Sequence, residues 1–107
     1  MTTDEWMNGE LTKKEDGYYI EGEDECVLYH HEREGIKKGV ELLCKEYEFE
    51  SVLEFGFGKG WTATEFQEQG VKRHVIIEPN IGIYKSALGW NKNHNAEILN
   101  MFSWEYE

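Results

Sequence analysis

The chain has 107 residues, a length that supports one domain with a modest hydrophobic core. Apolar residues make up 39% of it, and no run approaches the roughly 18 apolar residues that a membrane span requires. The net charge is −11, and residues 1–50 hold 15 acidic against 6 basic side chains. This balance argues against nucleic acid as a ligand, because phosphate contacts need clustered Lys and Arg. It fits a cationic substrate, a basic partner protein or simple solubility.

The first residues and the cysteines bear on location and metal binding. Met1–Glu5 is acidic and lacks the apolar core of a signal peptide, which predicts a cytoplasmic protein. Cys26 and Cys44 are expected to stay reduced there, and no CxxC pattern indicates zinc. His30 and Glu34 are one helical turn apart but lack a third ligand, so we favour a solvated helix face over a metal site.

The N-terminal segment predicts a short hairpin. Residues 15–17, Glu-Asp-Gly, form a turn signal between residues 11–14 and the apolar residues 18–20. Residues 22–25 then read as an exposed connection or the start of a helix.

A helical pattern runs from about Cys26 to Glu48. Apolar side chains recur there at three- and four-residue steps, with Lys and Glu between them: Ile36, Val40, Leu43 and Tyr47. This spacing predicts one amphipathic helix over residues 30–46. Cys44 lies on its apolar side, so we expect a core thiol there rather than a nucleophile.

Alternating strand and helix signals fill the remainder of the chain. They predict a strand at 51–55, a glycine turn at 56–60, a helix at 61–69, a strand at 74–78, a helix at about 80–90 and a strand at 96–100. Gly70 suits the end of the first of these helices, and Pro79 suits the beginning of the second. The consecutive apolar residues 75–77 indicate burial on both faces, as in a parallel sheet.

This order predicts an α/β fold, a truncated Rossmann-like sheet of three parallel strands with an N-terminal helix and hairpin. The predicted domains are an N-terminal extension at 1–28 and a half domain at 29–107. The strand at 51–55 would lie at the centre of a complete sheet, so here it leaves an exposed edge. Either the N-terminal hairpin covers that edge or a partner chain pairs with it, and we expect a homodimer.

The glycine turn indicates a ligand. Gly56, Gly58 and Gly60 permit a tight turn and close approach of a ligand to the backbone, and the N–H groups at the next helix favour a carboxylate or phosphate. Dinucleotide sites carry a third glycine where this chain has Trp61, which disfavours NAD and FAD. A carboxylate, Glu54, precedes the turn.

Glu78 ends the second strand, at the edge where ligands of open α/β sheets bind. A carboxylate there accepts hydrogen bonds from both hydroxyls of a ribose, so the pair of strands predicts an adenosine-containing cofactor. Trp61, Trp90 and Trp104 are candidates to stack on its base, with core packing as the alternative.

Residues 54–60, Glu-Phe-Gly-Phe-Gly-Lys-Gly, resemble the first motif of class I S-adenosylmethionine-dependent methyltransferases. Residues 64–68, residues 76–80 with Gly82, Tyr84 and Trp90, and residues 101–105 are similar to guanidinoacetate N-methyltransferase and its arginine-methylating relatives. The similarity covers roughly residues 29–107.

The resemblance implies that S-adenosylmethionine is the cofactor and assigns roles to particular residues. Its methionine end would be held at Glu54 and the glycine backbone, its ribose by Glu78, and its adenine beside Asn80 and beneath the loop at 101–104. Tyr29 and residues 30–34 match the helix that covers the cofactor in the family. The implied cofactor-binding residues are Glu54, Gly56, Phe57, Gly58, Gly60, Glu78, Pro79, Asn80, Phe102, Ser103 and Trp104.

The chain departs from the family where the acceptor should bind. The fourth strand, which carries an acidic and aromatic motif for the guanidino substrate in such enzymes, is expected to be absent, and no residue is predicted to be catalytic. Lys59 stands where the family has a neutral residue. Three hypotheses follow: N-methyl transfer to a small guanidino or cationic acceptor, an inactive S-adenosylmethionine-binding module, and an acidic protein-interaction domain.

Overall fold

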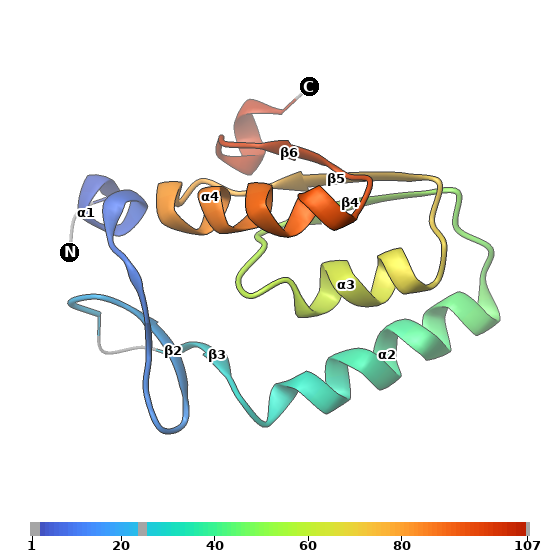
Figure 1. Cartoon of the computed structure of the whole chain (residues 1–107), viewed down its shortest axis with the longest axis horizontal. Helices are drawn as coiled ribbons and strands as arrows, with labels where there is room; N and C mark the ends of the chain where they lie inside the picture. The colour runs from blue at the N-terminus through green and yellow to red at the C-terminus, as the bar shows by residue number, and fades with distance from the viewer. Residues whose placement is uncertain (1–2, 24–25, 107) are drawn as a thin grey trace.

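The computed structural model describes residues 3–23 and 26–106 (Figure 1). The helices and strands are, in chain order, α1 Thr3–Asn8, β1 Leu11–Lys13, β2 Gly17–Ile20, β3 Cys26–Tyr29, α2 Glu32–Glu46, β4 Ser51–Phe55, α3 Trp61–Glu68, β5 Arg73–Ile77, α4 Ile81–Trp90, the 3-10 helix η1 Asn91–Asn93, β6 Glu97–Leu99 and the 3-10 helix η2 Ser103–Glu105. In this part of the chain, no helix is long and apolar enough to cross a membrane.

The N-terminal segment forms a small antiparallel sheet of β1, β2 and β3. The predicted hairpin is confirmed, since Leu11 pairs with Ile20 across the turn. The prediction that helical structure begins near Cys26 is wrong, because Cys26–Tyr29 pairs with β2 as a third strand, and α2 begins only at Glu32. Of the connection predicted at residues 22–25, Asp24 and Glu25 lie outside the described residues.

The parallel sheet of β4, β5 and β6 confirms the predicted fold class. Val52 pairs with His74 and Ile76 with Ile98, and both strand pairings are parallel. Helices α3 and α4 make the two crossovers, and α2 packs on α3. Helices α2 and α3 lie on one side of the sheet, whereas β6 leads to η2 on the other side (Figure 1). The result is the first half of a doubly wound sheet.

One hydrophobic core joins the N-terminal sheet to the parallel sheet. Ile20 of β2 is fully buried in a cluster with Phe57, Ala63, Ile76, Ile83 and Ala87. The predicted burial of residues 75–77 on both faces is confirmed, because all three side chains are buried. Each buried Ile contributes about 1.5–3 kcal/mol of transfer free energy. The packing of Ile20 therefore holds the hairpin beside the carboxyl ends of the parallel strands.

The edge of β4 stays exposed within the described part of the chain. The N-terminal hairpin belongs to a separate sheet and, among the described residues, forms no strand pairs with β4. Leu53 is 45% exposed and Phe55 62% exposed. Apolar side chains and unpaired backbone groups therefore lie together on this strand, and the partner chain expected there stays a prediction.

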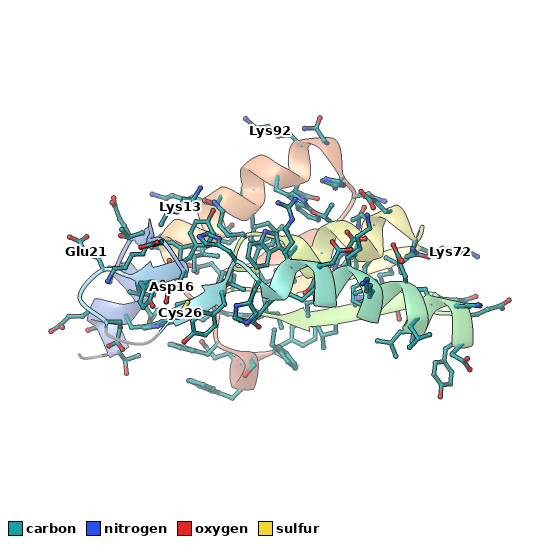
Figure 2. All side chains as sticks on the ribbon, turned by 90° about the horizontal axis from the view of Figure 1, so that it is seen from below. Lys13, Asp16, Glu21, Cys26, Lys72 and Lys92 are labelled. Atoms are coloured by element: carbon teal, nitrogen blue, oxygen red, sulfur yellow. The ribbon has the colours of Figure 1, made fainter. Side chains whose placement is uncertain are left out.

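Charged side chains project outward around this frame. The lysines Lys13, Lys72 and Lys92 lie at widely separated places (Figure 2). These three side chains therefore provide no basic cluster of the kind that binds a phosphate backbone.

Candidate functional site

A pocket of about 660 Å³ opens at the carboxyl ends of the parallel strands, where open α/β sheets bind ligands. The ends of β4 and β5 and the residues that follow β4, β5 and β6 form most of its wall, and α1, β3, α3 and α4 complete it. Its lining residues are Trp6, Val27, Leu28, Glu54, Phe55, Gly56, Phe57, Gly58, Thr62, Ile77, Glu78, Pro79, Ile83, Phe102, Ser103 and Trp104.

Glu78 is the best-positioned polar group of the pocket. Its Oε1 accepts a hydrogen bond from the backbone N–H of Phe57 at 2.7 Å, and its Oε2 accepts one from the N–H of Asn80 at 3.0 Å. The residue is only 3% exposed. An ionised carboxylate has about four acceptor positions, so two remain after these bonds. The arrangement suits a ligand that donates two adjacent hydroxyl groups.

The glycine turn shapes the wall between β4 and α3. Gly56 has φ +92° and donates its N–H to the carbonyl oxygen of Ile77 at 2.7 Å, which joins the ends of two strands. An added Cβ at Gly56 would meet no atom within 4 Å, whereas one at Gly60 would lie 2.5 Å from the Phe57 ring. Gly60 therefore leaves room for the buried Phe57 ring, and Gly56 keeps its backbone open.

Glu54 of β4 lines the pocket, and its carboxylate is bonded to a buried histidine on the neighbouring strand. Its Oε2 lies 2.6 Å from Nε2 of the buried His74 on β5. Glu54 and Glu78 carry the only charges among the described residues that line the pocket. Two carboxylates in a largely apolar wall favour a cationic ligand group.

Asn80 fastens the N-terminal segment to this site. Its Oδ1 accepts the N–H of Ile83 at 2.9 Å and so caps α4, while its Nδ2 donates to the carbonyl oxygens of Trp6 at 2.7 Å and Gly9 at 3.0 Å. Trp6 is thereby brought to the pocket wall. Asn80 itself does not line the pocket, and it supports the site through its backbone bond to Glu78.

The segment after β6 supplies an aromatic surface. The rings of Phe102 and Trp104 stack with centroids 4.3 Å apart and planes 8° apart. Trp104 lines the pocket and is 76% exposed, so much of its ring surface is open. A flat heterocyclic base would find stacking partners here.

The structure brings nine of the eleven predicted cofactor-binding residues into the pocket lining, and leaves out Gly60 and Asn80. Their binding of a cofactor stays a prediction. The sequence reasoning missed five lining residues on other elements: Trp6, Val27, Leu28, Thr62 and Ile83. Each is an ordinary apolar or hydroxyl residue without a motif, and tertiary packing alone brings it to the site.

Several other candidates lie elsewhere. His30 contacts the carbonyl oxygen of Lys14 through Nε2 at 3.0 Å, and the described residues contain no group of three metal-ligating side chains. Trp90 packs edge-on against Phe57 in the core, and Trp61 packs against Tyr18. Neither tryptophan lines the pocket, which leaves Trp104 of the three.

The residues of the pocket fit S-adenosylmethionine chemically. Glu78 offers acceptors for ribose hydroxyls, Glu54 offers negative charge for an ammonium group, and the Phe102–Trp104 pair offers an aromatic face. The backbone at Gly56 has no side chain to block a close approach.

Comparison with known proteins agrees with this fit. Residues 44–105 match the family model described as guanidinoacetate N-methyltransferase. Protein arginine N-methyltransferase 2 of Candida glabrata is 30% identical over 100 residues, which cover 90% of this chain and 24% of that protein. The chain thus spans about a quarter of the length of this curated relative. Since the family match covers more than half of its residues, the chain belongs to the guanidinoacetate N-methyltransferase family.

Proposed function

We propose that the chain binds S-adenosylmethionine in the pocket at the carboxyl ends of β4, β5 and β6. The observation that carries this proposal is the carboxylate of Glu78, which is buried and oriented by two backbone N–H groups while two acceptor positions remain. Backbone N–H groups do not rearrange as side chains do, so the carboxylate is preorganised for a diol. Family membership supports the same cofactor.

The acceptor proposed for methyl transfer is a small guanidino or cationic molecule. The cofactor, when bound, supplies an electrophilic methyl group on a sulfonium. Glu54 and Glu78 make the pocket negative, which attracts a cation, and its apolar wall excludes water from the reacting groups. Methyl transfer depends mainly on holding the acceptor in line with the methyl group, so orientation is the contribution expected from this chain.

A second candidate is a binding module without turnover. Both carboxylates of the pocket already accept hydrogen bonds from the protein, Glu54 from His74 and Glu78 from two backbone N–H groups. The other polar side chains in the described lining are Thr62 and Ser103, whose hydroxyls are weak bases. This module would bind S-adenosylmethionine and S-adenosylhomocysteine and consume neither.

Calorimetric titration with S-adenosylmethionine and with S-adenosylhomocysteine tests the binding proposal. We expect Glu78→Gln to lose most of the affinity, because an amide oxygen offers two acceptor positions where the carboxylate offers about four, too few for two backbone N–H groups and a diol. Glu41→Gln, a matched change at an exposed carboxylate of α2, should leave the affinity unchanged. Equal binding by wild type and Glu78→Gln would contradict the proposal. Transfer of a labelled methyl group to guanidinoacetate or arginine then separates the enzyme from the binding module.

We further propose that β4 pairs with β4 of a second copy of this chain. An antiparallel pairing centred on Leu53 would set Val52 opposite Glu54 and Ser51 opposite Phe55, so no like charges would face each other. This pairing would satisfy the unpaired backbone groups and cover the exposed apolar side chains of the strand. The net charge of −11 opposes association, so the dimer should strengthen as salt screens that repulsion.

A further inference from the structure

A buried imidazole lies directly behind the pocket carboxylate Glu54. His74 of β5 is 2% exposed, and its Nε2 lies 2.6 Å from Oε2 of Glu54. Its other ring nitrogen, Nδ1, lies 2.8 Å from Nε2 of Gln67 on α3. The side chains of Gln67, His74 and Glu54 thus form a hydrogen-bonded line from α3, along one face of the parallel sheet, to the pocket.

The surrounding bonds define which nitrogen of His74 carries the proton. Oε1 of Gln67 accepts the backbone N–H of Asn95 at 3.2 Å, so the NH₂ group of Gln67 is the end that faces His74. An NH₂ group only donates, and Nδ1 must therefore accept. The single proton of the neutral ring is then on Nε2, where it is donated to Glu54.

The two carboxylate oxygens of Glu54 differ in their hydrogen bonds. Oε2 is held by His74, whereas Oε1 bonds to none of the residues that the structure describes. In this part of the chain no buried side-chain nitrogen or oxygen lacks a partner, so Oε1 is open to solvent. The carboxylate of a pocket-lining residue thus has one anchored and one free oxygen.

We propose that His74 is a positioning residue for the cofactor: it holds Glu54 so that its free oxygen accepts the ammonium group at the methionine end of S-adenosylmethionine. This inference rests on the proposed function. A carboxylate that is already fixed loses little side-chain entropy when the ligand binds. A carboxylate that rotates freely loses that entropy on binding, which lowers the affinity. Gln67 contributes indirectly, because it keeps the proton of His74 on the side of Glu54.

The test compares two probes that differ only at the methionine end. S-adenosylhomocysteine carries the ammonium group, whereas 5′-methylthioadenosine keeps the adenosine and lacks the amino-acid end. We expect His74→Asn, whose amide replaces Nδ1 but does not reach Glu54, to weaken binding of S-adenosylhomocysteine about tenfold or more. Binding of 5′-methylthioadenosine should not change. His74→Gln, whose amide nitrogen can occupy the place of Nε2, should restore most of the affinity.

A double-mutant cycle adds a readout that a purely structural role would not move. In the Glu54→Gln background, His74→Asn should cost no further affinity, because both changes remove the same interaction. Should His74→Asn not fold, Gln67→Met serves instead, since it removes the group that keeps Nδ1 an acceptor. A smaller loss, again confined to S-adenosylhomocysteine, is expected for it, because the carboxylate of Glu54 also favours the proton on Nε2.

The outcomes separate this inference from the proposed function. Equal loss of both probes in His74→Asn, or no loss of either, would overturn the role of His74 while leaving the cofactor site standing. Binding of neither probe by the wild type would instead remove the cofactor site, and the inference with it.

Discussion

The carboxylate of Glu78 accepts the backbone N–H of Phe57 at 2.7 Å, across 21 residues of sequence. This bond joins the end of β5 to the glycine turn after β4, and Asn80 N–H occupies the second oxygen of the same carboxylate. This side chain therefore holds the turn in place, and in the proposed function it also presents acceptors to a ligand.

Removal of the Glu78 carboxylate should lower both stability and affinity. Glu78→Ala leaves two N–H groups without their acceptor, and each buried unsatisfied group costs about 1–3 kcal/mol of unfolding free energy. Glu78→Gln keeps one acceptor and should cost less stability, yet lose comparable affinity for S-adenosylmethionine. Urea unfolding and calorimetric titration of the two variants measure these effects. Unchanged unfolding of Glu78→Ala would show that water replaces the lost acceptor.

A side chain at Gly60 should destabilise the turn. The residue has φ +78°, and an added Cβ would lie 2.5 Å from the Phe57 ring. The left-handed conformation alone costs a non-glycine residue about 1–2 kcal/mol, and the clash adds to it. Gly35→Ala is the matched control, because its Cβ on α2 meets nothing within 4 Å. That control should be neutral or stabilising by up to about 1 kcal/mol, as measured by thermal unfolding.

The two functions of Asn80 can be separated by substitution. Asn80→Asp keeps an oxygen to cap α4 but loses the Nδ2 donor to Trp6 and Gly9. We expect it to release the N-terminal segment while α4 remains intact. Asn80→Ala should lose both contributions, with about 1 kcal/mol attributable to the cap. Tryptophan fluorescence and limited proteolysis near residue 9 report the release, and circular dichroism reports the helix.

A charge on the free edge of β4 should abolish self-association. Leu53→Lys places a cation at the centre of the proposed strand pair, where it would face its own copy. Light scattering after size-exclusion chromatography should give a dimer for wild type, stronger at high salt, and a monomer for this variant. Leu42→Lys, at an exposed position of α2, should remain dimeric. A monomeric wild type at every salt concentration would contradict the proposed pairing.

The parallel sheet was predictable because each of its strands and turns is marked by a short run of neighbouring residues. Residues 75–77 are consecutively apolar because β5 is buried on both faces, and Gly70, with φ +79°, ends α3 as its position predicts. The strand Cys26–Tyr29 was missed because four residues carry little periodicity and the longer helical pattern begins beside them. Helix α1, of six residues, is too short for an apolar repeat to show.

The candidate site was predictable only where motifs mark it. Glu78 and the glycine turn stand at strand ends, so their spacing places them at one edge. Trp6 and Leu28 reach the same pocket through contacts between distant segments. The hydrogen bond between His74 and Glu54 was not predicted either, because the two side chains come together only when β4 and β5 pair.

The hydrogen bond from Asn80 to Trp6 spans 74 residues. This bond closes a long loop, and closing so long a loop is entropically costly and slow. The wall of the pocket that Trp6 supplies should therefore form late in refolding, after the contacts between elements that are close in sequence.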